Sequence, residues 1–341
     1  MKNRVWNAYC YCSSQTQLLT MSFAKKWLFI LMLSLPYAGI AQDTLVNKLD
    51  SLTRKKDSAG QQINNINPKA YNARTDLDLK SYFVLLGSSL KQEFTKPFHM
   101  SKKDWKNFGL FTGGVAVVYF ADKPIQKAAL KLRNRNTGIN NISKYVTNFG
   151  GLYEGYTLAG LAAYGLVFKD KKVLTTTLLA TQSYITAAAL ETVIKFLAGE
   201  TRPSYYGPDQ VASPRFLGPF SKTQRDATGR KTYSSFPSGH TTVAFAAATV
   251  FASEYKDKPV IPIIAYSAAT LIGISRVTEN MHWTTDVLVG AALGFLSGKQ
   301  VVNNYHRYAK LKAPDQPKNS VSFTLHYSYG HFEPGLVYKF R

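Results

Sequence analysis

The sequence predicts an all-α fold, in which a bundle of six helices is followed by a small C-terminal β-hairpin. Hydrophobic residues make up 45% of the 341 residues, which is enough to bury a core. Between residues 102 and 302, long apolar stretches rich in alanine and glycine alternate with short polar breakers. These stretches predict helices over residues 105–120, 153–168, 173–197, 241–254, 260–274 and 283–302.

The first 41 residues carry the pattern of a secretory signal peptide. Lys25 and Lys26 precede an apolar run over residues 27–35, and small residues lead up to Ala41, after which we expect cleavage. Met21 is therefore the expected true start of the protein. The alternative is an uncleaved N-terminal anchor, although the apolar run is short for a membrane span. We expect the mature chain to be exported to the bacterial periplasm or cell envelope.

Three further segments follow the signal peptide. Residues 42–104 are predicted to form a polar, partly helical extension, and residues 105–310 the helical core. In the tail, residues 319–341, apolar and polar side chains alternate from residue 321 to residue 329, as in a β-strand with one buried face. The Glu-Pro-Gly sequence at 333–335 predicts the turn to a second strand.

The charge balance predicts anionic partners. The chain has 42 Lys and Arg against 20 Asp and Glu, a formal charge of +22. Nucleic acid, an anionic membrane surface and phosphorylated substrates all suit such a balance. The cysteines Cys10 and Cys12 are too few for a disulfide framework or a cysteine-based zinc site, and both lie in the expected signal peptide.

The first polar motif lies where the predicted helix 173–197 ends. Lys195 and Arg202 are two helical turns apart and so share a face, and Pro203 ends the element at Arg202. Two fixed cations are thus placed at the mouth of a helix. Taken alone, the segment also fits an ordinary helix exit, in which a lysine interacts with the helix dipole.

The second motif opens the predicted helix 241–254. Ser238 is a natural N-cap, Gly239 lets a ligand approach the backbone, and His240 follows in the same first turn. Free N–H groups and the helix dipole make such a turn suitable for an anion. A plain capped helix with an incidental histidine is the alternative.

The third motif joins the last two predicted helices. Arg276 ends one helix, and His282 and Asp286 open the next. Four residues apart on a helix, the imidazole and the carboxylate can meet. A carboxylate that holds one imidazole nitrogen leaves the other as an aimed nucleophile or base. The alternative is a structural histidine–aspartate pair.

Together the three motifs indicate a site for phosphoryl transfer. Three cations and the N–H groups of a helix end match the charge on the oxygens of a phosphoryl group in transfer. Arginine offers planar bidentate contacts to such oxygens, and lysine adds a point charge. The sequence contains no cluster with metal-ligand spacing, so we expect no metal.

At these residues the sequence resembles the type 2 phosphatidic acid phosphatase superfamily, which includes bacterial acid phosphatases and vanadium haloperoxidases. The family pattern is Lys-x6-Arg-Pro, then Pro-Ser-Gly-His, then Ser-Arg-x5-His-x3-Asp, and the chain carries all three without a substitution. The resemblance covers residues 105–305 and leaves out the extension and the tail. It implies a six-helix bundle of the acid phosphatase/haloperoxidase type.

The resemblance implies a hydrolase of phosphoric monoesters, or of lipid phosphates and pyrophosphates, that works through a phosphohistidine. His282 would attack phosphorus with Asp286 orienting it, and His240 would protonate the leaving oxygen and then activate water. The residues implied to hold the phosphoryl oxygens are Lys195, Arg202, Ser238, Gly239 and Arg276. No metal or other cofactor is implied, and vanadate is expected to bind as an inhibitor that mimics phosphate.

Two other function classes stay open. A vanadate-dependent haloperoxidase would use the same pocket, and a non-catalytic protein that binds anionic lipid would suit the charge. The intact set of His240, His282 and Asp286 argues against the second class, which needs none of them. The expected partners are a phosphorylated small molecule or phospholipid and an anionic membrane surface, rather than nucleic acid. The sequence predicts no oligomeric state.

The relation to the membrane is also open. Uncharged stretches within three of the predicted helices, residues 173–190, 260–275 and 287–297, are borderline or short against the roughly 20 residues of a span. If the signal exports the N-terminus and all six helices span, the site faces the cytoplasm. An exported helical bundle avoids that conflict and is our preferred interpretation, with peripheral or integral membrane association as the alternative.

Overall fold

The computed structural model describes Tyr71 and residues 75–207, 210–219, 225, 231–312, 320–328 and 331–339. This part of the chain is mostly helical, as the sequence predicts. It contains eight α-helices, three short 3-10 helices and two strands. The expected signal peptide and about half of the expected N-terminal extension lie outside the described residues.

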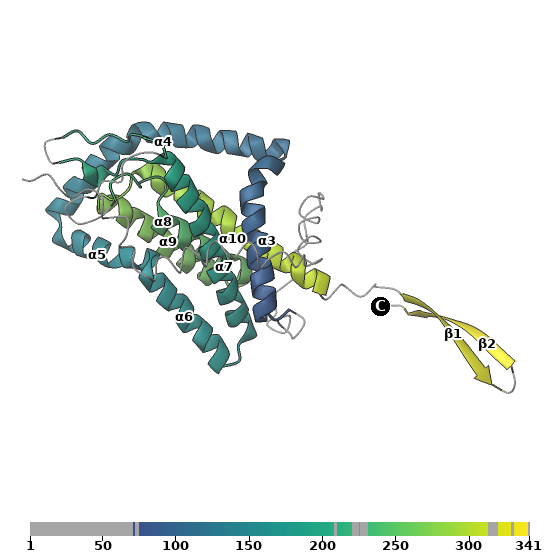
Figure 1. Cartoon of the computed structure of the whole chain (residues 1–341). Coiled ribbons are helices and arrows are strands. Elements are labelled where there is room, and N and C mark those ends of the chain that lie inside the picture. Colours follow the sequence, from purple (N-terminus) through teal and green to yellow (C-terminus); the bar gives the residue numbers. More distant parts are fainter. Residues whose placement is uncertain are drawn as a thin grey trace, which may run out of the picture. The chain divides into compact units, whose positions relative to one another are not determined.

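Four helices form the core that carries the motifs. They are α7 (Lys171–Ala198), α8 (Gly239–Glu254), α9 (Val260–Thr278) and α10 (Thr284–Lys312). The central one is α8, against which α7, α9 and α10 all pack (Figure 1). Most of its side chains are buried, including Val243, Ala246 and Val250. These four helices confirm the helices predicted over the same stretches.

Three glycines let α10 pack closely against α8. Gly290, Gly294 and Gly298 are four residues apart and so share one face of α10. A Cβ atom on Gly294 would lie only 2.1 Å from the carbonyl oxygen of Thr242. No side chain fits between the two backbones there. The close approach aligns the first turns of both helices, and those turns carry predicted site residues.

Four more helices surround this core, and they correct the predicted count of six. They are α3 (Leu79–Thr95), α4 (Lys102–Arg135), α5 (Thr137–Thr147) and α6 (Leu152–Val167). Helix α6 packs on α7, α5 on α9, and α4 on both α9 and α10. Helices α3 and α5 were not among the predicted six, which is why the count was too low.

Helix α3 confirms that the N-terminal extension is partly helical, although the face that this helix buries is mostly polar. Its Gln92 donates a hydrogen bond to Asn304 of α10 at 3.1 Å. Its Glu93 accepts one from Ser297 of α10 at 3.0 Å. Both α3 side chains are buried. An apolar stripe is the usual signal of a packed helix, and this contact does not have one.

Helix α4 runs on past the predicted breaker at Pro124. The prediction ended this helix at residue 120, but the structure continues it to Arg135. A proline inside a helix removes one main-chain hydrogen bond and bends the helix, and it need not end it. The end comes at Asn136, whose backbone is extended and whose side chain caps α5 by accepting from the Ile139 amide at 3.1 Å.

Two antiparallel strands lie in the tail. They are β1 (Ser320–Ser328) and β2 (His331–Lys339), with Ser320 opposite Lys339 and Ser328 opposite His331. The predicted turn at residues 333–335 is wrong, because those residues lie within β2.

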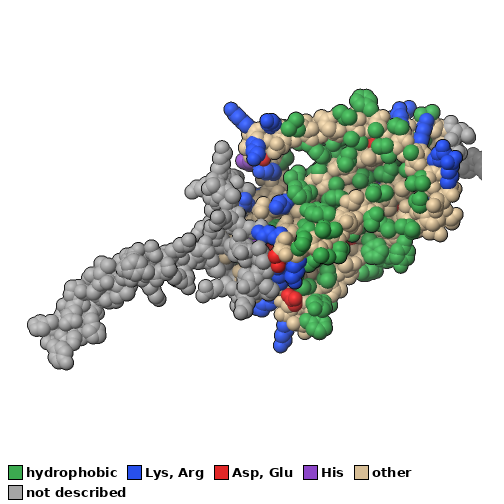
Figure 2. Space-filling view, turned by 180° about the vertical axis from the view of Figure 1, so that it is seen from behind, with side chains coloured by type: hydrophobic (Ala, Val, Ile, Leu, Met, Phe, Trp, Pro, Cys, Tyr) green, Lys and Arg blue, Asp and Glu red, His purple; other side chains and the backbone are tan. Residues whose placement is uncertain are grey.

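A broad apolar surface covers several helices. Figure 2 shows hydrophobic side chains over much of one face, with Lys and Arg gathered towards its edges. Val117 of α4, Val167 of α6 and Ile263 of α9 are 71%, 73% and 64% exposed. Within the described residues, two helices, α7 and α9, are long and apolar enough to cross a membrane by length and composition. Only 28% of the most apolar window of α9 is buried.

Candidate phosphoryl-transfer site

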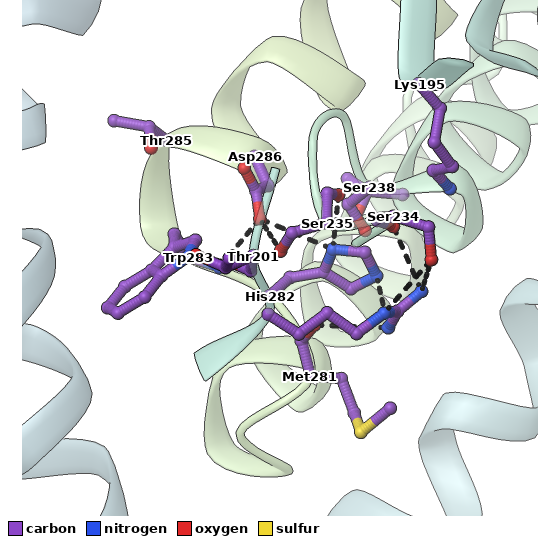
Figure 3. Close-up of polar contacts among 12 residues, drawn as sticks. Lys195, Thr201, Ser234, Ser235, Ser238, Met281, His282, Trp283, Thr285 and Asp286 are labelled. Carbon is purple, nitrogen blue, oxygen red and sulfur yellow. Dashed lines mark hydrogen bonds and ion pairs between the residues drawn. The ribbon is translucent and has the colours of Figure 1, made fainter. Parts of the chain in front are cut away.

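The three motifs meet at one end of the core, where α7 ends and α8 and α10 begin (Figure 3). The Ser238 amide donates to the carbonyl oxygen of Asp286 at 3.0 Å, which joins the second motif to the third. Nη1 of Arg202 donates to the carbonyl oxygen of Met281 at 3.2 Å, which joins the first to the third. The structure therefore brings together motifs that lie far apart in the sequence.

His282 is buried at the centre of the site, with 2% of its surface exposed. Its Nδ1 lies 2.8 Å from the carbonyl oxygen of Ser235 and 3.4 Å from Oδ2 of Asp286. A proton on Nδ1 satisfies the carbonyl acceptor and leaves the lone pair on Nε2. Nε2 faces Nη1 of Arg202 at 3.5 Å. The orienting role that the sequence assigns to Asp286 is thus shared with a main-chain carbonyl.

Asp286 is fully buried and accepts hydrogen bonds through one oxygen. Its Oδ2 accepts from the Ser235 hydroxyl at 2.6 Å and from the Trp283 amide at 2.9 Å. The Trp283 indole donates to the carbonyl oxygen of Thr201 at 2.8 Å, next to Arg202. Side-chain and main-chain donors therefore fix the carboxylate beside His282.

The surroundings favour the neutral form of His282. Burial lowers its pKa well below 6.5, because a charged imidazolium would lose its hydration. The cations of Arg202, Arg276 and Lys195 lower the pKa further by repulsion. A neutral imidazole with a free lone pair is the form that can act as a nucleophile.

The two arginines are held by different partners. Nη2 of Arg202 donates to both the carbonyl oxygen and the hydroxyl of Ser234, at 3.1 and 3.2 Å. Nη1 of the buried Arg276 donates to the Thr147 hydroxyl at 2.5 Å and lies 3.5 Å from a carboxylate oxygen of Glu279. Both planar guanidinium groups are therefore fixed before any anion binds.

Lys195 pairs with Glu191, one turn earlier on α7. Sequence reasoning did not include this carboxylate. A Cβ atom on Gly239 would lie 2.7 Å from Oε1 of Glu191 and 3.5 Å from Nζ of Lys195. The absence of a side chain at Gly239 thus lets the first turn of α8 approach the lysine. This places the two predicted phosphate-binding groups side by side.

His240 faces the start of α6, and Ser238 bonds within its own helix turn. A Cβ atom on Gly151 would lie 3.3 Å from Nε2 of His240, so a side chain at position 151 would crowd the ring edge. Ser238 is fully buried, and its hydroxyl bonds to that of Thr241 at 2.9 Å rather than to a main-chain amide. Ser238 stands at the predicted N-cap position, although its side chain makes no capping hydrogen bond to the main chain.

Several residues of the site went unpredicted. The sequence offered one signal for two of them, since Ser234 and Ser235 directly precede the Phe-Pro-Ser-Gly-His segment. Thr147 and Gly151 come from the junction of α5 and α6, and nothing in the sequence connects them to the motifs. In the described part of the chain, no three His, Cys, Asp or Glu gather as a metal site requires. Independence of metal stays a prediction.

Residues 176–309 match the family model of the PAP2 superfamily. A lipid A 1-phosphatase of Porphyromonas gingivalis is 44% identical over 81 residues, 24% of this chain and 18% of that protein. Lipid phosphate phosphatase 1 of Arabidopsis thaliana is 34% identical over 119 residues, 30% of this chain and 36% of that protein. The chain therefore spans well under half the length of both relatives.

A solved structure is also similar to this chain. It is a transmembrane PAP2-type phosphatidylglycerolphosphate phosphatase from Bacillus subtilis, 25% identical, with a TM-score of 0.42. The similarity covers 57% of this chain and 91% of the other.

Proposed function

The chain belongs to the PAP2 superfamily over residues 176–309, and on that premise we propose that it is a phosphatase acting on a phosphorylated membrane lipid through a phosphohistidine on His282. The observation that carries the proposal is the environment of His282. The ring is buried, and its lowered pKa favours the neutral form. Its Nδ1 lies against the carbonyl oxygen of Ser235, and its Nε2 faces the guanidinium of Arg202. A phosphoryl group bound by Arg202 would lie in front of the nucleophilic nitrogen.

The first step transfers the phosphoryl group to the enzyme. Nε2 of His282 forms a bond to phosphorus while the bond from phosphorus to the leaving oxygen breaks. The phosphoryl oxygens are held by the cationic side chains of Arg202, Arg276 and Lys195 and by the N–H group of Gly239. These groups stabilise the negative charge that develops on the oxygens in the transition state. His240 donates a proton to the leaving oxygen. A lipid phosphate then releases a neutral alcohol, and a lipid pyrophosphate releases a lipid monophosphate.

The second step releases inorganic phosphate. His240, now neutral, takes a proton from a water molecule, and the water oxygen bonds to phosphorus as the bond to Nε2 breaks. The carboxylate of Asp286 lies 3.4 Å from Nδ1 and stabilises the positive charge that the ring carries as a phosphohistidine. His282 and His240 then return to their starting forms.

The apolar surface supports a protein embedded in the membrane. Soluble monomers rarely expose contiguous apolar patches larger than a few hundred Å². Here Val117, Val167 and Ile263 are more than 60% exposed on three different helices, and α7 and α9 are long enough to span. We therefore favour an integral protein over the water-soluble exported bundle that the sequence suggested. The cations at the edges of this surface suit anionic head groups.

A substrate panel tests the function. The full chain, purified in detergent, is assayed with p-nitrophenyl phosphate, phosphatidic acid, phosphatidylglycerol phosphate, lipid A and undecaprenyl pyrophosphate. We expect phosphate release from at least one of the lipids, inhibition by orthovanadate and no inhibition by EDTA. Strong inhibition by EDTA would contradict the metal-free mechanism.

Two variants make the panel specific. His282→Ala removes the nucleophile and should abolish both phosphate release and labelling of the protein by a radioactive substrate quenched in alkali. His99→Ala, in the exposed segment before α4, is the matched control and should keep both. Labelling that survives in His282→Ala would contradict the assigned nucleophile. Bromide oxidation after vanadate loading would instead favour the haloperoxidase alternative.

A further inference from the structure

A second buried carboxyl group, Glu200, lies behind the candidate site. It follows α7 within the first motif, and none of its surface is exposed. Its carbonyl oxygen accepts a hydrogen bond from the Ser235 amide at 3.0 Å, and its backbone pairs with that of Phe216. These main-chain contacts fix Glu200 between the segments that carry Ser235 and Phe216. The role described above for the site does not use its side chain.

Three carboxyl oxygen atoms in this region, two of Glu200 and Oδ1 of Asp286, accept no hydrogen bond from the residues that the structure describes. The two carboxyl groups lie within hydrogen-bonding reach of each other. Two ionised carboxylates offer only acceptors and repel, and such groups are costly when buried. One proton between them supplies the missing donor and removes one of the two charges.

We propose that Glu200 is a positioning residue that stays protonated and donates its O–H to Oδ1 of Asp286. Asp286 already accepts two hydrogen bonds on Oδ2, from Ser235 and Trp283, which stabilise its anion. Glu200 has no such donors, so the proton belongs to Glu200. Burial raises the pKa of Glu200 far above its ordinary value, and the negative charges of Asp286 and Asp122 raise it further.

The remaining groups near Glu200 fit this assignment. Asp122 accepts from the Thr285 amide at 3.0 Å and from the Thr285 hydroxyl at 2.5 Å, so its charge is stabilised on the other side. The phenol of Tyr119 is the other titratable group in range. No cation faces Glu200 among the groups that affect its charge, so nothing nearby would favour an ionised Glu200.

A neutral Glu200 has a clear effect on the proposed reaction. With Glu200 as a third donor beside Ser235 and Trp283, Asp286 stays an oriented anion. It does not take the proton from Nδ1 of His282. It can then stabilise the positive ring that forms when Nε2 bonds to phosphorus. An ionised Glu200 would add a second negative charge behind a site that must bind a phosphate. This role rests on the proposed function, whereas the shared proton does not.

Infrared spectroscopy tests the proton directly, without any substrate. We expect a protonated carboxyl band in the full-length protein that persists from pH 6 to pH 9. At pH 9, where the raised pKa values of Glu93 (about 7) and Glu154 (about 8) leave both mainly ionised, the band should be missing in Glu200→Gln. At the same pH it should be present in Glu93→Gln, which removes a buried carboxyl outside the site. If Glu200→Gln loses only an ionised carboxylate band, the proposal is overturned.

Kinetics test the positioning role with a matched pair of variants. Glu200→Leu removes the donor, and we expect kcat to fall about 10- to 100-fold with little change in KM. The acidic limb of the pH–rate profile of Glu200→Leu should move to higher pH, because Asp286 is easier to protonate without the donor. Glu200→Gln keeps an N–H donor and should recover most of the kcat. Glu93→Leu, the control for losing a buried carboxyl, should leave the pH profile in place.

Two results would overturn the positioning role. One is a Glu200→Leu variant that matches Glu200→Gln in kcat and pH profile. The other is a Glu200→Gln variant as inactive as Glu200→Leu although its thermal unfolding matches the wild type. A wild-type protein that is inactive across the substrate panel would contradict the proposed function instead, and the infrared result would still decide the shared proton.

Discussion

The carbonyl oxygen of Ser235 is the nearest acceptor to Nδ1 of His282, at 2.8 Å. The carboxylate of Asp286 is farther from the same atom, at 3.4 Å. A main-chain acceptor fixes the imidazole tautomer whatever the charge of its neighbours. The tautomer and the stabilising charge of the site therefore come from two different groups, and substitutions can separate them.

Asp286→Asn should reduce catalysis without abolishing it. The substitution removes the negative charge beside the ring, but the Ser235 carbonyl still keeps the proton on Nδ1. We expect kcat to fall by less than the roughly 10⁴-fold that follows when a histidine tautomer is lost. His282→Ala, measured in parallel, should show no turnover at all. An Asp286→Asn enzyme as inactive as His282→Ala would show that Ser235 does not hold the tautomer.

The residues of the candidate site could be proposed from the sequence because the expected chemistry requires particular side chains at particular spacings. The spacing of four residues between His282 and Asp286 predicts their contact, which the structure shows at 3.4 Å. The shared helical face predicted for Lys195 and Arg202 is wrong, because α7 ends at Ala198, Gly199 has a left-handed backbone, and Arg202 lies beyond the helix with an extended backbone. The Ser235 carbonyl could not be predicted in this way, because every residue has a carbonyl. Only the path of the chain brings that oxygen to His282.

The helices likewise differ in how clearly the sequence predicts them. Helices α7 to α10 have apolar stretches between clear breakers, and the prediction placed all four. Helix α3 buries glutamine and glutamate against α10, so the sequence predicts a partly helical extension there but no packed core helix. At Pro124 a local rule favoured a break, and the rest of α4 outweighed it. Tertiary contacts decided both cases, and a single sequence does not contain them.

Gly151→Ala should impair the histidine expected to protonate the leaving group. The new Cβ atom would lie 3.3 Å from Nε2 of His240, closer than a methyl group normally sits, and would cover the ring edge. We expect kcat to fall about 10- to 100-fold, the usual range of a lost general acid or base being about 10²- to 10⁴-fold.

The same helix supplies the control for Gly151→Ala. A Cβ atom on Gly155, one turn later in α6, would meet nothing within 4 Å. Gly155→Ala should therefore keep full activity and slightly stabilise the helix. Equal activity in both variants would mean that Nε2 of His240 is not used on the side that Gly151 faces.

The activity should persist to a pH below 6.5. His282 must be neutral to attack, and its pKa is lowered well below 6.5, first by burial and then by the nearby cations. At any pH above this lowered pKa the ring is neutral, so protonation removes activity only in more acidic solution. The measurement is the rate of protein phosphorylation in a single turnover from pH 4 to pH 8. Samples returned from pH 4 to pH 7 should recover full activity, which separates titration from unfolding. An acidic limb centred at or above pH 6.5 would contradict the assignment of His282 as the neutral nucleophile.

Helix α9 offers the sharpest test of a membrane-embedded chain. Ile263 and Ile264 are 64% and 62% exposed. If this surface faced water, replacing both isoleucines by glutamate would increase the solubility of the protein. In a lipid bilayer each buried charge costs roughly 3 kcal/mol, so Ile263→Glu with Ile264→Glu should prevent stable insertion. Lys258→Glu, in the exposed segment before α9, is the control and should not affect insertion. Wild-type protein should leave the membrane fraction only in detergent, whereas the double variant should be degraded or aggregated. Release of the wild type by high salt or carbonate would show that the apolar surface does not lie in lipid.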